Sequence, residues 1–329
     1  MRNNSLNQRF QLNKVLKNIF GIKEIGLVFI LILVCSLLTW RSPVFLSGRN
    51  IGVLLSQVSM MAIVAFGMTI LLIVGEVDLS VGSQQAFIGV LTMQILNLTS
   101  NLWLGILAGL SIGLLIGLIN AILVNKLKIV SFVITLAMMF ILRGLSYSTT
   151  REAVQNFHNI KGFAKIGNGF IWFIPIPVLI MVIVFVIFYL LLSYTTFGRQ
   201  VYAIGGNTRT AFICGIKVNT IKAICFIITA VLSSLSAIIL ISRMNSGQNN
   251  AGYGFEMQVV AIALLGGCTL EGGSGSLLGT LLAAMLIGVI NNGVVLLGID
   301  SSWQMVIIGV VILFSIIDKR VGVFKRSGI

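Results

Sequence analysis

The sequence has few charged side chains, and acidic ones are the scarcest. Only 9% of its 329 residues are Asp, Glu, Lys or Arg, and only 8 are acidic. A water-soluble protein of this length needs much more polar surface than that to cover an apolar core. The composition therefore excludes a soluble globular enzyme or binding domain.

Residue types that build catalytic and metal sites are also scarce. There is a single histidine, His158, in a polar connection, and the four cysteines show no CxxC or other metal-ligand spacing. No G-x-x-x-x-G-K-[S/T] phosphate-binding loop is present, and no nucleophile, metal cluster or redox pair stands out. We therefore expect a chain that is not an enzyme and holds no metal and no cofactor of its own.

Proline is rare, with 3 residues, whereas hydrophobic residues make up 57% of the chain and glycine occurs 35 times. The mean hydropathy is +1.08, and the apolar runs approach the ~20 residues that cross a bilayer as a helix. They do not alternate as barrel strands do. We expect an all-α multi-spanning membrane protein with about ten transmembrane helices. The expected spans are residues 22–40, 51–74, 80–98, 103–124, 129–148, 171–194, 219–242, 255–270, 275–297 and 302–317.

The basic residues favour cytoplasmic termini. With the N-terminus inside, 15 of the 22 Lys and Arg lie on the cytoplasmic side and 7 lie outside or at outer helix ends. This topology explains the net charge of +14 without a nucleic-acid partner. The expected organisation is a basic cytoplasmic segment 1–24, a membrane domain 25–318 with an uncleaved first helix, and a basic cytoplasmic tail 319–329. Longer polar connections are expected outside at 149–170 and inside at 195–217.

A glycine ridge runs along the expected fourth span. Gly105, Gly109, Gly113 and Gly117 recur every four residues, so they share one side of the helix. Small residues at this spacing let another helix approach closely. We expect helix packing inside the chain at this ridge, with subunit contact as the alternative.

The stretch Gly-Glu-Val-Asp-Leu-Ser-Val-Gly-Ser interrupts the apolar pattern with Glu76, Asp78, Ser80 and Ser83. A carboxylate at the bilayer centre costs about 2.5 to 3.5 kcal/mol on insertion scales, so neither acid is expected to face lipid. Two interpretations stay open. The stretch is either a tight interfacial hairpin in which Asp78 or Ser80 caps the next helix, or a broken-helix segment that lines a solute pathway.

The inner connection predicts a glycine turn, a short capped helix and a glycine stop. Asn207 or Thr208 can cap this helix and Gly215 can end it. Arg209 and the apolar Phe212 share one side of it, which gives a short amphipathic element. By itself this pattern also fits a helix that lies on the membrane surface. A third glycine-rich stretch, residues 266–276, lacks the features of a nucleotide site.

Several ordered motifs resemble the permeases of bacterial sugar ABC importers, the ribose, xylose, galactose and autoinducer-2 group. The resemblance begins at the Gly-Glu-Val-Asp-Leu-Ser-Val-Gly-Ser stretch and runs from about residue 45 to Asp318. Glu76 stands where many members have glycine or another small residue. The other matching motifs are Thr135-Leu136-Ala137, Arg143-Gly144-Leu145, Gly198-Arg199, Gly205-Gly206-Asn207 with Ala211 and Gly215, Leu265-Gly266-Gly267, Gly272 to Ser276, Asn291-Asn292-Gly293 and Gln304.

This resemblance implies an importer made of two permease subunits in the inner membrane, cytoplasmic ATPase subunits that bind the ATP, and an extracytoplasmic binding protein that delivers the sugar. It also implies that the segment of Gly205, Gly206, Asn207, Arg209, Ala211 and Gly215 docks into the ATPase. The first alternative is an ion-coupled secondary transporter in which Glu76 and Asp78 bind a proton or sodium ion. The second is a membrane scaffold that only recruits partners. The sequence does not name the solute.

Overall fold

The computed structural model describes residues 22–150, 155–156, 160, 162–300 and 302–313. The predicted basic segment 1–24 lies almost entirely outside these residues, as do His158 and the tail 319–329. Helices account for most of the described residues. The helices are α2 (Ile22–Arg41), α3 (Gly48–Ile73), α4 (Val81–Thr99), α5 (Leu102–Leu127), α6 (Ser131–Thr150), α7 (Phe163–Asn168), α8 (Ile176–Tyr194), α9 (Thr196–Gly206), α10 (Thr208–Ile213), α11 (Val218–Met244), α12 (Phe255–Leu265), α13 (Leu277–Leu296) and a last helix, Ser302–Leu313.

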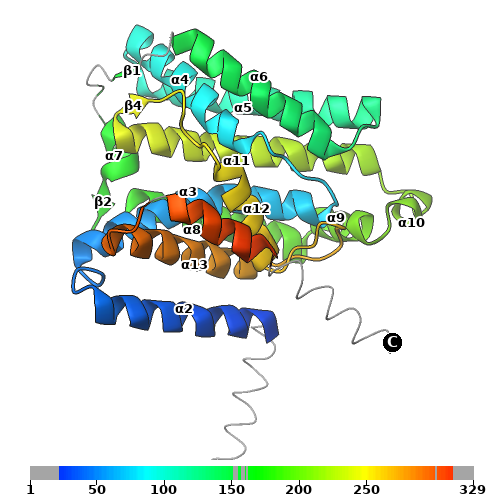
Figure 1. The fold of residues 1–329 in the computed structure, drawn as a ribbon. Coiled ribbons are helices and arrows are strands. Elements are labelled where there is room, and N and C mark those ends of the chain that lie inside the picture. Colours follow the sequence, from blue (N-terminus) through cyan, green and yellow to red (C-terminus); the bar gives the residue numbers. More distant parts are fainter. Residues whose placement is uncertain (1–21, 151–154, 157–159, 161, 301, 314–329) are drawn as a thin grey trace, which may run out of the picture.

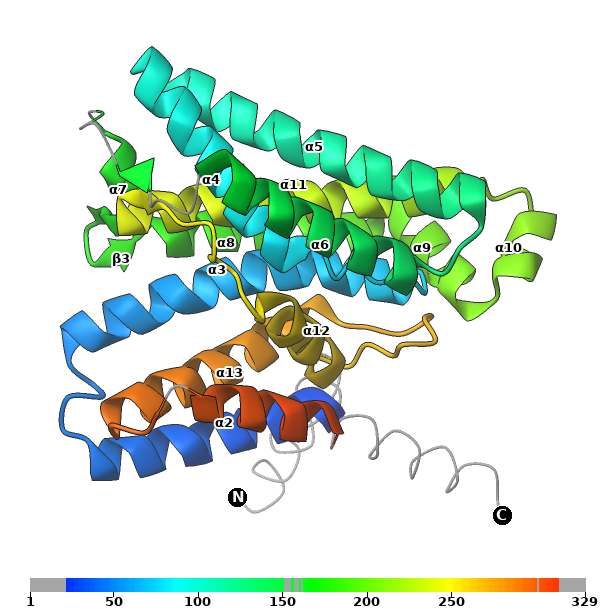
Figure 2. The same cartoon turned by 45° about the horizontal axis from the view of Figure 1, so that its top comes forward.

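Four two-residue strands lie in the connections. β1 (Gln155–Asn156) pairs antiparallel with β4 (Ser246–Gly247), and β2 (Phe170–Ile171) pairs antiparallel with β3 (Ile174–Pro175). Figure 1 shows the long helices side by side, with α7 and these strands at one end of the bundle and α10 at the other. We call these the α7 end and the α10 end. Both the start of α2 and the end of the last helix point toward the α10 end (Figures 1 and 2).

Seven of the helices are long and apolar enough to cross a membrane: α2, α3, α5, α6, α8, α11 and α13. The protein is therefore a helical multi-pass membrane protein, as predicted. Three of the ten predicted spans are not among the seven. The 19 residues of α4 are long enough, but they include buried polar side chains such as Gln84 and Gln85. Helix α12 has 11 residues and covers only about 16 Å of a hydrocarbon core of ~30 Å, and the last helix is also shorter than a span within the described residues.

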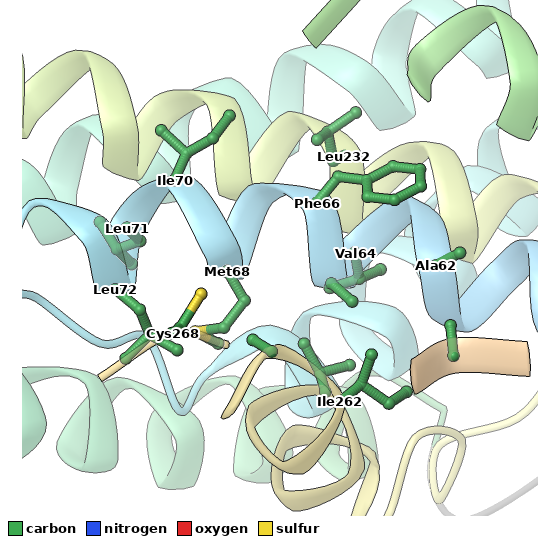
Figure 3. Packing of buried hydrophobic residues seen from close by; sticks show 14 of the residues in the cluster. Ala62, Val64, Phe66, Met68, Ile70, Leu71, Leu72, Leu232, Ile262 and Cys268 are labelled. Carbon is green, nitrogen blue, oxygen red and sulfur yellow. The ribbon is translucent and has the colours of Figure 1, made fainter. Parts of the chain in front are cut away.

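Helix α3 is the centre of the bundle. Nearly every residue from Ser56 to Ile73 is buried, because α11, α13, α8 and α12 pack around it. Figure 3 shows Phe66, Met68 and Leu232 among the side chains that fill this core. In contrast, α2 and α8 expose large apolar side chains along most of their length, as expected of helices that face lipid.

The glycine ridge of α5 faces the inside of the bundle, where α5 packs on α4 and α11. Gly105 lies against Leu96 of α4, and Gly109 lies between Thr92 of α4 and Ile238 of α11. Gly113 and Gly117 lie against α11. A β-carbon at Gly117 would come within 2.8 Å of the Ile227 backbone. The structure thus places Gly105, Gly109, Gly113 and Gly117 at contacts within the chain.

Candidate functional site

A cavity of about 290 Å³ lies inside the bundle, and its wall is rich in carboxamides. Each amide side chain comes from a different helix. They are Gln57 of α3, Gln85 of α4, Gln258 of α12, Asn291 of α13 and Gln304 of the last helix. Tyr253 and several apolar side chains complete the wall, and it contains no acidic or basic residue. We call this space the amide cavity.

Hydrogen bonds place the amide cavity near the middle of the bundle. The Gln85 amide donates to Ser236 Oγ at 2.9 Å, and Ser236 Oγ donates to the Met60 carbonyl at 3.1 Å. Met60 is halfway along α3. In contrast, Gln57, Gln258 and Asn291 make no side-chain hydrogen bond to another described residue, so their amides are available to the contents of the cavity.

Two interrupted helices meet beside the amide cavity. Residues 74–80 between α3 and α4 run without helical structure, and α4 begins where Ser233 Oγ of α11 donates to the Val81 carbonyl at 3.0 Å. Helix α12 begins after Gly254, and its first turn packs on α4. Non-helical backbone at membrane depth is tolerated where it is buried in protein or lines a water-filled cavity. The sequence left this stretch open between an interfacial hairpin and a broken helix that lines a solute pathway. In the structure residues 74–80 are non-helical, and none of them lines the amide cavity.

The non-helical segment 74–80 is held by neighbouring helices. Ser131 Oγ accepts from the Val77 N–H at 3.2 Å, and Thr135 Oγ1 accepts from the Leu79 N–H at 3.1 Å. Both side chains belong to the first turns of α6. The backbone groups that helix formation would have satisfied are therefore paired with side chains.

Asp78 is fully buried at the centre of a polar cluster. Its carboxylate accepts from the Ser80 N–H at 2.8 Å, from Ser80 Oγ at 2.5 Å, and from the Gln84 and Asn120 amides at 3.3 Å each. Asn120 belongs to α5, so the cluster joins α5 to the start of α4. Ser83 Oγ donates to the Ser80 carbonyl at 2.8 Å. None of Asp78, Ser80 and Ser83 lines the amide cavity.

Glu76 forms an ion pair with Lys222, near the start of α11. Both side chains are mostly buried, at 10% exposed for Glu76 and 19% for Lys222. This contact ties segment 74–80 to the helix that follows α10. Glu76 does not line the amide cavity either.

We expect this ion pair to contribute about 1 kcal/mol of coupling energy, because its partners are neither fully exposed nor fully desolvated. The measurement is a double-mutant cycle on thermal unfolding in detergent, with Glu76→Gln, Lys222→Met and both together. Strictly additive effects of the two substitutions would show that the pair contributes nothing.

Three glycine-rich segments converge at the α10 end. Gly205 of α9 lies against the Ile73 carbonyl, where α3 ends, and against the Gly273 backbone. The Gly273 N–H donates to the Ile73 carbonyl at 2.8 Å. Gly272 adopts φ +89°, and a β-carbon on it would come within 3.0 Å of Gly75 Cα and 3.2 Å of Gly205 Cα. We call this contact of α3, α9 and the α12–α13 loop the glycine junction.

Tyr202 of α9 adds a side-chain contact to the glycine junction. Its hydroxyl donates to the Gly275 carbonyl at 2.9 Å. Burial, with a smaller contribution from Cys268, raises the pKa of the Tyr202 hydroxyl above its ordinary value, so the hydroxyl stays a donor at neutral pH. The α9 helix is therefore fixed to the loop that begins α13.

The short helix α10 lies beyond the glycine junction. Asn207 caps it by accepting from the Thr210 N–H at 2.9 Å, and Gly215 follows its end with φ +83°. These features match the predicted cap and stop. Ala211 is buried against the protein, whereas Arg209 and Phe212 are exposed. Helix α10 thus presents a basic and apolar face at the end of the bundle.

The residues predicted from the sequence as site candidates lie in two different places in the structure, the α10 end and the polar cluster around Asp78. Glu76 and Gly205 lie near the α10 end, at the ion pair and at the glycine junction, while Asp78 lies in a closed polar cluster. The amides of Gln57, Gln85 and Gln258 were not among the sequence candidates. Each is a polar side chain within a mainly apolar helix, which is a signal in the sequence. Their convergence is visible only when the helices pack.

A polar cavity between the helices of a multi-pass membrane protein is typical of membrane transport proteins. The family model described as the permease component of the branched-chain amino acid transport system matches residues 50–316, and the chain belongs to this family. This match, together with the sugar permeases described next, confirms the family resemblance found in the sequence motifs.

Similar relatives include the ribose import permease protein RbsC of Bacillus subtilis (strain 168), which is 41% identical over 89% of this chain and 90% of its own. RbsC of Escherichia coli (strain K12) is 36% identical over 89% of this chain and 92% of its own. The L-arabinose transport system permease protein AraH of Escherichia coli (strain K12) is 37% identical over 88% of each chain. No solved structure matches the chain significantly.

Proposed function

We propose that this chain is the permease subunit of an ATP-driven importer for a sugar or sugar-like solute. Two permease subunits form the pathway, separate ATPase subunits at the α10 end supply the energy, and an extracytoplasmic binding protein delivers the solute at the α7 end. The ribose and arabinose permeases that cover about nine-tenths of this chain support this assignment. The chain itself catalyses no reaction, because its partners hydrolyse the ATP.

The observation that carries the proposal is the α9–α10 segment. Phe212 and Ile213 are 71% and 75% exposed at the tip of a capped helix that lies outside the seven apolar spans. Exposed apolar side chains next to a basic one fit a protein partner. The same segment contacts the ends of α3 and the α12–α13 loop at the glycine junction. An ATPase bound to α10 can therefore move α3, α12 and α13, which carry three amides of the cavity.

The same proposal includes the full membrane topology. Each of the ten predicted segments contains a helix within the described residues, so α4, α12 and the last helix complete a membrane domain of ten segments. The α10 end is cytoplasmic, as the distribution of Lys and Arg indicates. Both chain termini are then cytoplasmic, and the complex lies in the inner membrane.

The ion-coupled alternative uses Glu76 and Asp78 as ion ligands. In the structure Glu76 is paired with Lys222, and the Asp78 carboxylate already accepts four hydrogen bonds. Neither acid lines the amide cavity. These contacts favour structural roles for both acids and support the ATP-driven importer.

Radiolabelled ribose uptake into vesicles tests the proposal. We expect uptake only when the vesicles contain this chain and its ATPase, with ATP on the ATPase side and loaded binding protein on the other. Omission of any one component should reduce uptake to background. Uptake by this chain alone, driven by a sodium or proton gradient, would instead establish the ion-coupled transporter. The absence of flux of any sugar in every assembly would favour the scaffold.

A further inference from the structure

The amide cavity has a chemistry that selects its contents. Carboxamides are neutral, and each offers both donors and acceptors. The hydroxyl groups of a sugar have the same dual character, so amides and hydroxyls pair without any net charge. Tyr253 and the apolar part of the wall are suited to the C–H faces between the hydroxyls.

The unpaired amides indicate that the cavity holds polar material. Gln57, Gln258 and Asn291 are each half-buried and make no side-chain hydrogen bond to another described residue. A polar group without a partner costs about 1 to 3 kcal/mol when it is fully buried, and a half-buried group carries part of that cost. Three such groups around one space are stabilised when water or a hydroxylated solute fills it.

The size of the cavity limits the solute. Its volume of about 290 Å³ lies at the lower end of the range for small-molecule sites, which is roughly 300 to 1,000 Å³. A monosaccharide fits such a space. No charged side chain lines the wall. A phosphate or carboxylate that entered would lose its hydration without gaining a counter-charge.

We infer that the amide cavity is a weak binding site for a neutral monosaccharide in transit, at which Gln57, Gln258 and Asn291 bind the hydroxyls and the lack of charge excludes sugar phosphates. This inference rests on the proposed function and adds to it a selective site within the permease. A solute released by the binding protein then pauses at the level of the two interrupted helices, where α4 and α12 begin.

The direct test is saturation-transfer NMR on the solubilised permease–ATPase complex without binding protein. The probes are ribose and ribose 5-phosphate. We expect a ribose signal from the wild-type complex that falls at least threefold in Gln258→Leu and in Asn291→Leu, and no signal from ribose 5-phosphate. Gln94→Leu is the matched control, because Gln94 lies on α4 outside the cavity and donates to the Thr149 carbonyl.

Transport in the full importer gives the second readout. With saturating loaded binding protein, Gln258→Leu and Asn291→Leu should lower the maximal ribose uptake rate about three- to fivefold, while binding protein still stimulates ATP hydrolysis. Wild-type uptake rates and an unchanged ribose signal in both variants would overturn the site. An equal signal from ribose 5-phosphate would overturn the inference that the uncharged wall excludes sugar phosphates. Failure of the proposed function is distinct, since wild-type uptake would then not require ATP.

Discussion

Replacement of Gly205 by alanine is expected to reduce ATP-driven uptake at least 30-fold. The added β-carbon would overlap the Ile73 carbonyl and the Gly273 N–H at the glycine junction. Both are backbone atoms, and the Gly273 N–H is already bonded to that carbonyl. Neither can move without displacing α9 from the end of α3 or the loop that begins α13. Overpacking of this kind typically costs about 1 to 3 kcal/mol, and here it acts at the contact that joins α10 to the cavity helices.

The neighbouring residue provides the matched control. A β-carbon on Gly206 would meet no atom within 4 Å, although the sequence gives no reason to distinguish the two glycines. Uptake and ATP hydrolysis are measured on both variants in vesicles. We expect Gly205→Ala to insert into the membrane and to lose the coupling of hydrolysis to uptake, and Gly206→Ala to retain at least half of the wild-type uptake. Equal activity of the two variants would contradict the role of the glycine junction.

Replacement of Asp78 by alanine is expected to destabilise the protein by about 2 to 4 kcal/mol, because fully buried donors lose their acceptor. The Ser80 N–H loses the bond of 2.8 Å that it donates to Asp78. The Gln84 and Asn120 amides keep only Ser80 Oγ as a partner. The contact between α5 and the start of α4 is thereby weakened. The thermal unfolding midpoint in detergent should fall, and uptake should drop about tenfold.

Asp78→Asn separates a structural role from ion coupling. Asparagine keeps one acceptor oxygen for Ser80, and its NH₂ group can donate to Oε1 of Gln84 or Oδ1 of Asn120, which have no partner in the structure. Rotation of those two amides completes the exchange. We therefore expect a loss of only about 1 kcal/mol, with at least a third of wild-type uptake. If Asp78 bound a coupling ion, loss of its charge would abolish uptake in both variants and remove its dependence on sodium or protons.

Only some features of the fold and of the site could be predicted from the sequence. The different positions of Gly205 and Gly206, and of Asp78 and the cavity amides, could not. The length of the apolar runs located a helix in each of the ten expected segments, because the bilayer requires long apolar segments. It did not locate α7 or α9, which lie in the polar connections. Local hydrogen bonds can also be predicted from the sequence. The predicted helix cap at Asn207 and the predicted helix end at Gly215 agree with the structure. Side chains that meet across the bundle have no such local signal. Gln57 and Asn291 are 234 positions apart, yet they line one cavity.

The conformation of segment 74–80 also depends on side chains that are distant in the sequence. The sequence indicates that a carboxylate at position 78 is costly in lipid, and it leaves both an interfacial hairpin and a broken helix open. The non-helical conformation of the segment depends on Ser131 and Thr135 of α6, which accept its backbone N–H groups. It also depends on Asn120 of α5, which donates to the Asp78 carboxylate. These partners lie 42 to 56 residues along the chain from the groups that they bind.

The sequence by itself therefore determined that this protein lies in a membrane, where its ten main helical segments are and to which family it belongs. Hydropathy, caps and ordered motifs are properties of short stretches of chain. Tertiary structure alone decided which polar residues face a cavity and which are consumed in internal hydrogen bonds. It placed Asp78 and Glu76 in structural contacts, and it brought five amides from five helices around one space. The physical reason is that burial and pairing depend on which helix faces become neighbours, and packing of the whole bundle sets that.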